Sequence, residues 1–107
     1  EGRTFDVVVG DYLLGAVEKE WPYGAGRVLD RLLDSVRPGG YLLIVGIEPY
    51  EGVLSPESRQ DRLVLDIERL GDAAAALSGK ASYRELPEDW VTDRIARRGG
   101  FRVVASK

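Results

Sequence analysis

One segment constrains the fold of this chain more than any other: Arg-Pro-Gly-Gly at residues 37–40, followed directly by the apolar run Tyr-Leu-Leu-Ile-Val-Gly at 41–46. Proline and paired glycines interrupt helical geometry, so the first part predicts a helix end and a sharp turn. Alternating apolar and polar residues after the turn would indicate a strand with one face in water, whereas a continuous apolar run is typical of a strand covered on both faces. We therefore predict a layered α/β fold, with helices on both faces of a mainly parallel sheet.

An earlier apolar run, Phe-Asp-Val-Val-Val-Gly at residues 5–10, predicts a second buried strand, because β-branched residues dominate it and a glycine ends it. Between the two runs, apolar residues recur at helical steps and predict a helix over residues 24–36. That apolar stripe consists of Val28, Leu29, Leu32, Leu33 and Val36. The charged Asp30 and Asp34 should point elsewhere. Strand, helix and strand in this order form a right-handed crossover unit.

The rest of the chain predicts two more helices and a third strand. Ser55, Pro56 and Glu57 suit the cap, the first position and the first turn of a helix. Its apolar stripe follows as Leu63, Ile67, Leu70, Ala74 and Leu77. We expect one partial α/β domain over residues 1–107, made of a strand at 5–10, a helix at 24–36, a strand at 41–47, a helix at 56–78, a helix at 88–98 and a strand at 101–106. The connection at 11–18 fits either a short helical turn or an ordered loop.

Composition limits the chemistry available to the chain. Its 107 residues include no cysteine and no histidine, so it offers no disulfide, no thiolate or imidazole ligand and no imidazole base. We therefore expect no metal site, and any proton transfer has to use carboxylates, tyrosine or lysine.

Charge and hydropathy limit the partners. The net charge of -3 argues against a general affinity for nucleic acid or anionic lipid. Arg94, Arg97 and Arg98 form a short basic cluster, which we interpret as the solvated end of a helix. No apolar stretch approaches the roughly 20 residues that span a bilayer. We expect a soluble, cytoplasmic protein without a nucleic-acid or membrane partner, and we interpret a chain without methionine as a fragment of a longer protein.

Three segments together resemble the second half of the catalytic domain of class I S-adenosylmethionine-dependent methyltransferases. Residues 5–9 are similar to the family's fourth strand, residues 37–44 to the start of its fifth, and residues 98–103 to the start of its sixth. The resemblance covers nearly the whole chain and implies a Rossmann-like three-layer sandwich with the cofactor S-adenosyl-L-methionine. The family's glycine-rich loop, its ribose-binding acid and its seventh strand, which lies between the fifth and sixth, have no counterpart in these residues. The resemblance therefore implies that this chain alone is inactive and that a longer chain or a partner supplies the remaining half of the domain.

Ligands of open α/β sheets bind beyond the carboxyl ends of the strands. After the first strand this edge carries Gly10, Asp11, Tyr12 and Leu13, which the resemblance places at the methionine and methyl end of the cofactor. Asp11 and Tyr12 are also candidate catalytic residues. A helix-capping role for Asp11 and a core-edge role for Tyr12 are the competing interpretations.

After the second strand, the same edge carries Glu48, Pro49 and Tyr50. Glu48 is a candidate catalytic base, because a carboxylate there could accept a proton from the methyl acceptor or bind a cationic substrate, although a solvated loop acid is an equal alternative. Pro49, Tyr50 and the earlier Trp21 are candidate substrate-binding residues, since aromatic faces attract cations and flat rings.

The leading function is methyl transfer to a small-molecule acceptor. Displacement at a sulfonium needs mainly alignment and, for some acceptors, a base, so the absence of histidine does not exclude it. The first alternative is a non-catalytic α/β module for interaction or oligomerisation, and homo-oligomers are expected wherever apolar surface stays open. The second is a receiver-like regulatory domain in which Asp11 accepts a phosphoryl group, for which the required acidic pair and lysine are not suitably placed.

Overall fold

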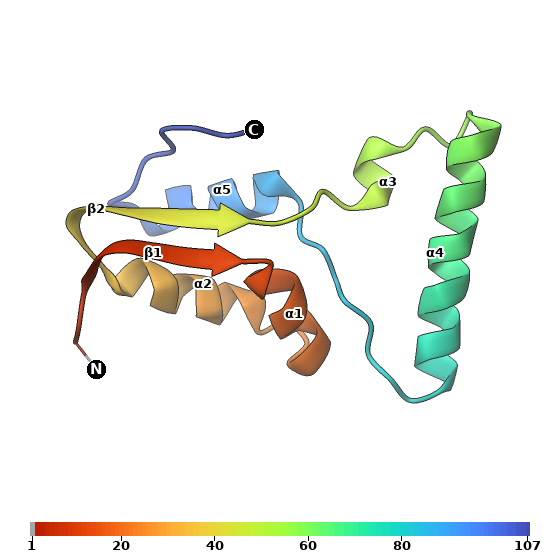
Figure 1. The fold of residues 1–107 in the computed structure, drawn as a ribbon, viewed down its shortest axis with the longest axis horizontal. Helices are drawn as coiled ribbons and strands as arrows, with labels where there is room; N and C mark the ends of the chain where they lie inside the picture. The colour runs from red at the N-terminus through yellow and green to blue at the C-terminus, as the bar shows by residue number, and fades with distance from the viewer. Residues whose placement is uncertain (1) are drawn as a thin grey trace.

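A computed structural model describes residues 2–107 of the chain. In chain order its elements are β1 (Phe5–Asp11), α1 (Leu13–Glu20), α2 (Ala25–Asp34), β2 (Val36–Val45), α3 (Tyr50–Val53), α4 (Arg59–Leu77) and α5 (Glu88–Arg98). Figure 1 shows β1, β2, α1, α2 and α5 in one body, with α4 standing apart from it. The fold is therefore mixed α/β, and within residues 2–107 its sheet consists of two parallel strands.

The predicted strand, helix and strand unit is confirmed. β1 and β2 pair in parallel, with Val7 opposite Tyr41 and Asp11 opposite Val45. α2 connects the two strands and buries Leu29 and Leu33 against the sheet. The helical spacing of its apolar residues therefore identified both the helix and the face that it buries.

β2 starts at Val36 rather than at the predicted 41, and the preceding helix ends correspondingly earlier. The Arg-Pro-Gly-Gly segment thus lies inside the strand, where a register shift near the start of β1 accommodates it. A Cβ atom at Gly40 would lie 2.7 Å from the carbonyl oxygen of Asp6, so only glycine permits this approach of the two backbones. Pairing with β1 therefore outweighs the turn preference of the local residues.

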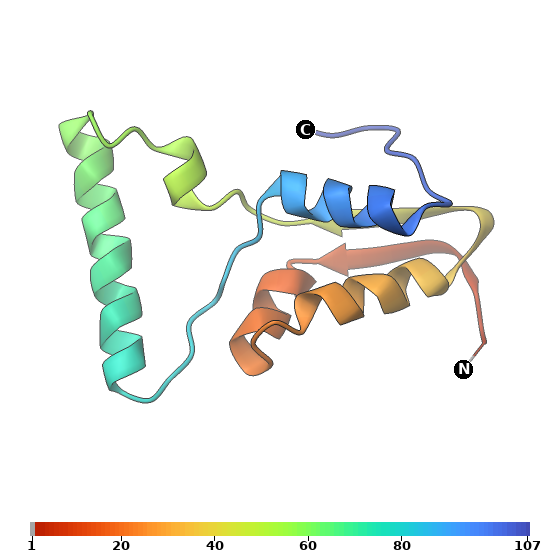
Figure 2. The same ribbon diagram turned by 180° about the vertical axis from the view of Figure 1, so that it is seen from behind.

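The helices of the body pack on one face of the sheet. Figures 1 and 2 agree that α2 and α5 lie on the same side of β1 and β2. The buried centre consists of Leu14, Ala25, Leu29 and Leu33, and Leu42, Ile44, Trp90, Val91 and Ile95 pack around it. One core therefore joins α1, α2, α5 and the inner face of β2.

The other face of the sheet is apolar and open. Six side chains are between 42% and 59% exposed: Phe5, Val7, Val9, Tyr41, Leu43 and Val45. The continuous apolar runs thus give both faces an apolar surface, but among residues 2–107 no helix covers the second face. A full three-layer sandwich is consequently not present in this part of the chain.

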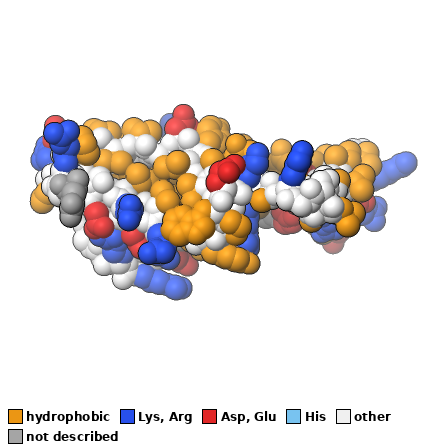
Figure 3. Space-filling model, turned by 90° about the horizontal axis from the view of Figure 1, so that it is seen from below, with side chains coloured by type: hydrophobic (Ala, Val, Ile, Leu, Met, Phe, Trp, Pro, Cys, Tyr) orange, Lys and Arg blue, Asp and Glu red, His pale blue; other side chains and the backbone are white. Residues whose placement is uncertain are grey.

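α4 begins at Arg59 rather than at 56, because Ser58 and not Ser55 is its N-cap. The Ser58 hydroxyl accepts a hydrogen bond from the backbone N–H of Asp61 at 3.3 Å. The helix ends at Leu77, one residue before the predicted limit. Hydrophobic side chains lie on the surface both over the body and at the end of the molecule that α4 forms (Figure 3).

The strand predicted at 101–106 is wrong for this structure. The segment has no assigned secondary structure, although the Phe101 side chain packs against the core. A strand requires a neighbouring strand for its backbone hydrogen bonds, and within residues 2–107 none lies beside it. The helix predicted at 88–98 is confirmed as α5, while the connection at 11–18 contains the helix α1.

Candidate functional site

The carboxyl ends of β1 and β2 lie at the same edge of the sheet, as Figure 1 shows. The backbone N–H of Tyr12 donates a hydrogen bond to the carbonyl oxygen of Val45 at 2.9 Å. This bond joins the segment after β1 to the end of β2. The structure therefore brings the candidates Gly10 to Leu13 close to the residues that follow Val45.

Gly10 has a packing role at this edge. It is buried, and a Cβ atom there would lie 2.9 Å from Ile44 Cδ1 and 3.3 Å from Leu32 Cδ1. Leu13, half-buried, begins α1. These two residues shape the edge from within and present little side-chain surface to a ligand.

Asp11 and Tyr12 are the candidates that face outward. Side chains alternate along a strand, so Asp11 shares the open face of the sheet with Val7 and Val9. Its side chain is exposed, and no hydrogen-bond donor among residues 2–107 contacts its carboxylate. Tyr12 is half-exposed and has the left-handed backbone conformation at φ 50° that turns the chain from β1 into α1.

Glu48 follows β2 and contacts α5. Its Oε1 atom accepts a hydrogen bond from the backbone N–H of Glu88, the first residue of α5. An acid at this position satisfies an otherwise free helix N–H and favours the positive end of the helix. Glu48 therefore has a structural partner that the sequence interpretation did not foresee.

Of the remaining substrate-binding candidates, Pro49 and Tyr50 lie together after β2, and Trp21 lies apart from them. Pro49 is the N-cap of α3, and Tyr50 begins that short helix with its side chain 43% exposed. Trp21 is the C-cap of α1, whose eight residues span about 12 Å, and its ring lies 5.4 Å from the guanidinium of Arg27. The helix α1 therefore separates Trp21 from Tyr12, and the structure does not bring Trp21 to the sheet edge.

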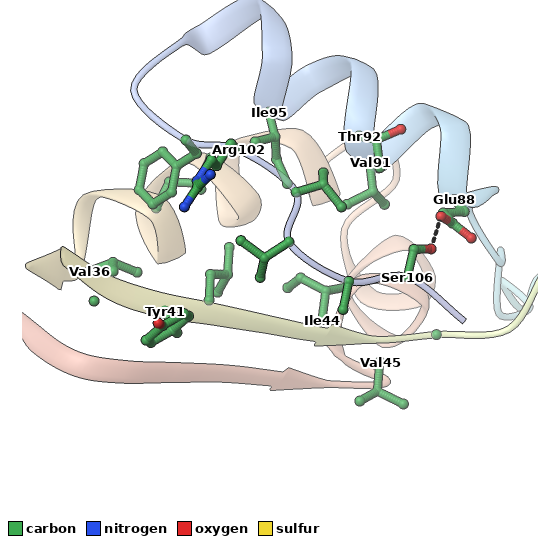
Figure 4. Close-up of a pocket in the computed structure, with 18 of the residues that line it drawn as sticks. Val36, Tyr41, Ile44, Val45, Glu88, Val91, Thr92, Ile95, Arg102 and Ser106 are labelled. Carbon is green, nitrogen blue, oxygen red and sulfur yellow. Dashed lines mark hydrogen bonds between the residues drawn. The ribbon is translucent and has the colours of Figure 1, made fainter. Parts of the chain in front are cut away.

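A large groove that the sequence did not reveal lies beside the free edge of β2. Its volume is about 1070 Å³, and its walls are β2, α5 and the chain at 100–107. We call it the β2 groove, and Figure 4 shows its interior. The labelled lining residues include Val36, Ile44, Val91, Ile95, Glu88 and Ser106. The Ser106 hydroxyl donates a hydrogen bond to the Glu88 carboxylate, which ties the end of the chain to the first turn of α5.

Two unpaired backbones border this groove. β2 pairs with β1 alone within residues 2–107, so its other edge has free N–H and carbonyl groups. In the same part of the chain, no backbone hydrogen bond involves 101–107. The residues at 101–106 have strand-forming side chains but no strand partner within residues 2–107.

An ion-pair cluster holds α5 on α2. Arg94 donates two hydrogen bonds to the Asp30 carboxylate, at 2.8 and 3.2 Å, and Arg98 pairs with Asp34. The hydrogen bond from Arg94 holds the pKa of Asp30 below its ordinary value of 3.8. The interpretation of these arginines as a solvated helix end was therefore wrong for Arg94 and Arg98, because the facing acids lie 64 positions away in sequence.

Glu18 is a buried acid that sequence reasoning missed. Its carboxylate accepts hydrogen bonds from the backbone N–H groups of Tyr23 at 2.9 Å and Ala25 at 3.0 Å. It thereby holds the turn between α1 and α2, in which Tyr23 has a positive φ of 65°. Sequence spacing contains no signal for this role, since an isolated glutamate in an amphipathic helix normally faces water.

Within residues 2–107, no helix is both long and apolar enough to cross a membrane. Comparisons with protein-family models, with curated proteins and with solved structures found no match for this chain.

Proposed function

We propose that this chain is the C-terminal part of an S-adenosylmethionine-dependent methyltransferase domain that acts on a small-molecule acceptor. The observation that carries the proposal is the parallel unit β1, α2 and β2, whose carboxyl ends present Asp11 and Tyr12 beside the segment leading to Glu48. In open α/β sheets this edge is where ligands bind. The resemblance assigns the same edge to the methyl end of the cofactor.

The open sheet face supports the same proposal. Parallel sheets occur almost entirely with both faces covered, and here six apolar side chains of the second face are exposed. A further layer of helices from the remaining half of the domain would complete a Rossmann-like three-layer sandwich. Asp11 lies on this face, so the completing layer would also border the candidate site.

The β2 groove, beside the free edge of β2, also supports the methyltransferase proposal. The resemblance places one more strand between the counterparts of β2 and 101–106, and the groove separates these two segments. Their unpaired backbone groups could then bond to that strand.

The residues at the edge fit only part of the cofactor. S-adenosylmethionine supplies an electrophilic methyl group on a sulfonium centre. The exposed Tyr12 ring can attract a cation, and the exposed Asp11 carboxylate can hold a proton or a cationic acceptor. The groups that hold the ribose are expected from the other half of the domain.

Calorimetric titration of S-adenosylhomocysteine tests the proposal. We expect saturable binding by the longer protein that contains this chain and none by the 107-residue chain alone. Within the longer protein, Asp11→Asn and Tyr12→Ala should weaken binding or methyl transfer at least tenfold. Asp6→Asn is the matched control. Asp6 lies near the start of β1, at the end away from the candidate site, and its ion pair with Arg37 is exposed.

A longer protein that binds no S-adenosylhomocysteine would refute the proposal. The second candidate, a non-catalytic interaction module, would then be favoured, since the open apolar face of the sheet is also typical of a binding surface.

A further inference from the structure

α4 carries a narrow apolar seam along one side. Its members follow one another at steps of four, three, four and three residues: Leu63, Ile67, Leu70, Ala74 and Leu77. This is the seven-residue repeat in which two helices pack along a shared seam, with Ile67 and Ala74 at a positions and the leucines at d positions. Leu70 is 71% exposed and Leu77 90% exposed, so within residues 2–107 the seam has no covering partner.

The contacts of α4 with its own chain lie on the opposite side of the helix. Leu65, at an f position, is only 4% exposed. The Asp61 carboxylate accepts the backbone N–H of Ser55 at 2.9 Å, and the Asp72 carboxylate accepts the Ser82 hydroxyl at 2.9 Å. Positions b and f therefore face the chain, and the a and d seam faces away from it.

We propose that the α4 seam pairs with the α4 seam of a second copy of this chain, with the two helices antiparallel. The charge distribution of the helix favours this direction. Arg59 lies in the first turn at a g position beside the seam, where the positive end of its own helix disfavours it, and the last turn has no basic residue. An antiparallel pair places Arg59 beside the negative end of the other helix, whereas a parallel pair places the two Arg59 side chains at the same end.

The seam also has a consistent antiparallel register. Ile67 packs against Leu70 of the second copy, and Leu63 packs against its Ala74. At the ends of the pair, Gln60 faces Leu77 of the second copy. Beside the seam, Gly71 and Ala73 have little or no side chain, so the two helices can approach closely.

The pairing should be weak. The 19 residues of α4 form a rod about 28 Å long, and an interface of this length falls within the transient class below about 1,200 Å². Association should therefore become visible only at high protein concentration.

Two alanine variants give a matched test. Ala74 lies in the seam and Ala76 outside it at a c position, and both are exposed in the same helix. We expect the sedimentation coefficient of the wild type and of Ala76→Glu to rise with concentration, and that of Ala74→Glu to stay constant. Equal behaviour of the two variants, or a wild type that stays monomeric at about millimolar concentration, would overturn the proposal. Circular dichroism of both variants checks that the helix is retained.

Cysteine cross-linking tests the direction, since the chain has no cysteine of its own. Gln60→Cys and Leu77→Cys chains are oxidised separately and as a mixture. The antiparallel pair predicts a mixed disulfide that forms only in the mixture. Disulfides within each separate variant would indicate a parallel pair and overturn the direction. Association that persists in Ala74→Glu but disappears in Val9→Glu would place the interface on the open sheet face instead. None of these results depends on cofactor binding.

Discussion

Replacement of Glu18 by alanine should destabilise the body of this protein far more than the replacement of a neighbouring acid. Glu18 is buried, at 8% exposure, and its carboxylate accepts two backbone hydrogen bonds from the turn between α1 and α2. In Glu18→Ala, the N–H of the fully buried Ala25 loses its acceptor, at a cost of about 1–3 kcal/mol. The partly buried N–H of Tyr23 adds about 0.5–1.5 kcal/mol.

The expected loss in the free energy of unfolding is therefore about 1.5–4.5 kcal/mol, or a fall in Tm on the order of 6–36 °C for a domain of this size. Urea unfolding followed by tryptophan fluorescence measures it, since Trp21 adjoins the same turn. Glu18→Gln should lose less, because one amide oxygen can still accept one bond. Glu20→Ala is the control, because Glu20 is exposed in the same helix.

A loss below about 0.5 kcal/mol in Glu18→Ala, within the range of ordinary surface substitutions, would refute this reasoning. The same conclusion would follow if Glu18→Ala and Glu20→Ala had equal unfolding midpoints, since burial would then play no part.

Two further predictions concern packing and charge. In Gly40→Ala the new Cβ atom would lie 2.7 Å from a backbone oxygen of β1, so we expect a loss of about 1–3 kcal/mol by urea unfolding, whereas Gly46→Ala, with nothing within 4 Å, should change little. Equal stability of the two alanine variants would contradict the close approach of the strands. The Arg94 hydrogen bond lowers the pKa of Asp30 in the folded protein below its ordinary value of 3.8. The stabilisation by this ion pair is therefore fully present above the ordinary pKa and is lost as the pH falls through the lower pKa of the folded protein. The difference in Tm between wild type and Arg94→Gln should therefore shrink between about pH 5 and about pH 2, and a constant difference would contradict this assignment.

The sheet edge could be predicted from the sequence because it depends on chain order. Two apolar runs joined by a helix place Asp11 at the end of β1 and Glu48 after β2, and parallel strands end at one edge. The contact between Glu48 and the first turn of α5 could not be predicted, since the two partners lie 40 positions apart. The position of Trp21 could not be predicted for a related reason. The sequence left open whether 11–18 forms a loop or a helix, and the helix α1 places Trp21 away from the sheet edge.

Local signals in the sequence predict four features: the strand at 5–10, the helical repeat of α2, the apolar stripe of α4 and the bounds of α5. Periodicity and helix ends act within a few residues, so they can be seen without any neighbour. Three other features could be seen only in the folded chain: β2 begins at Val36, the backbone of 101–106 is unpaired within residues 2–107, and one apolar face of the sheet is open. Each of these depends on which surface lies opposite, because a strand exists by its backbone partners and an apolar face is buried only when another layer packs on it.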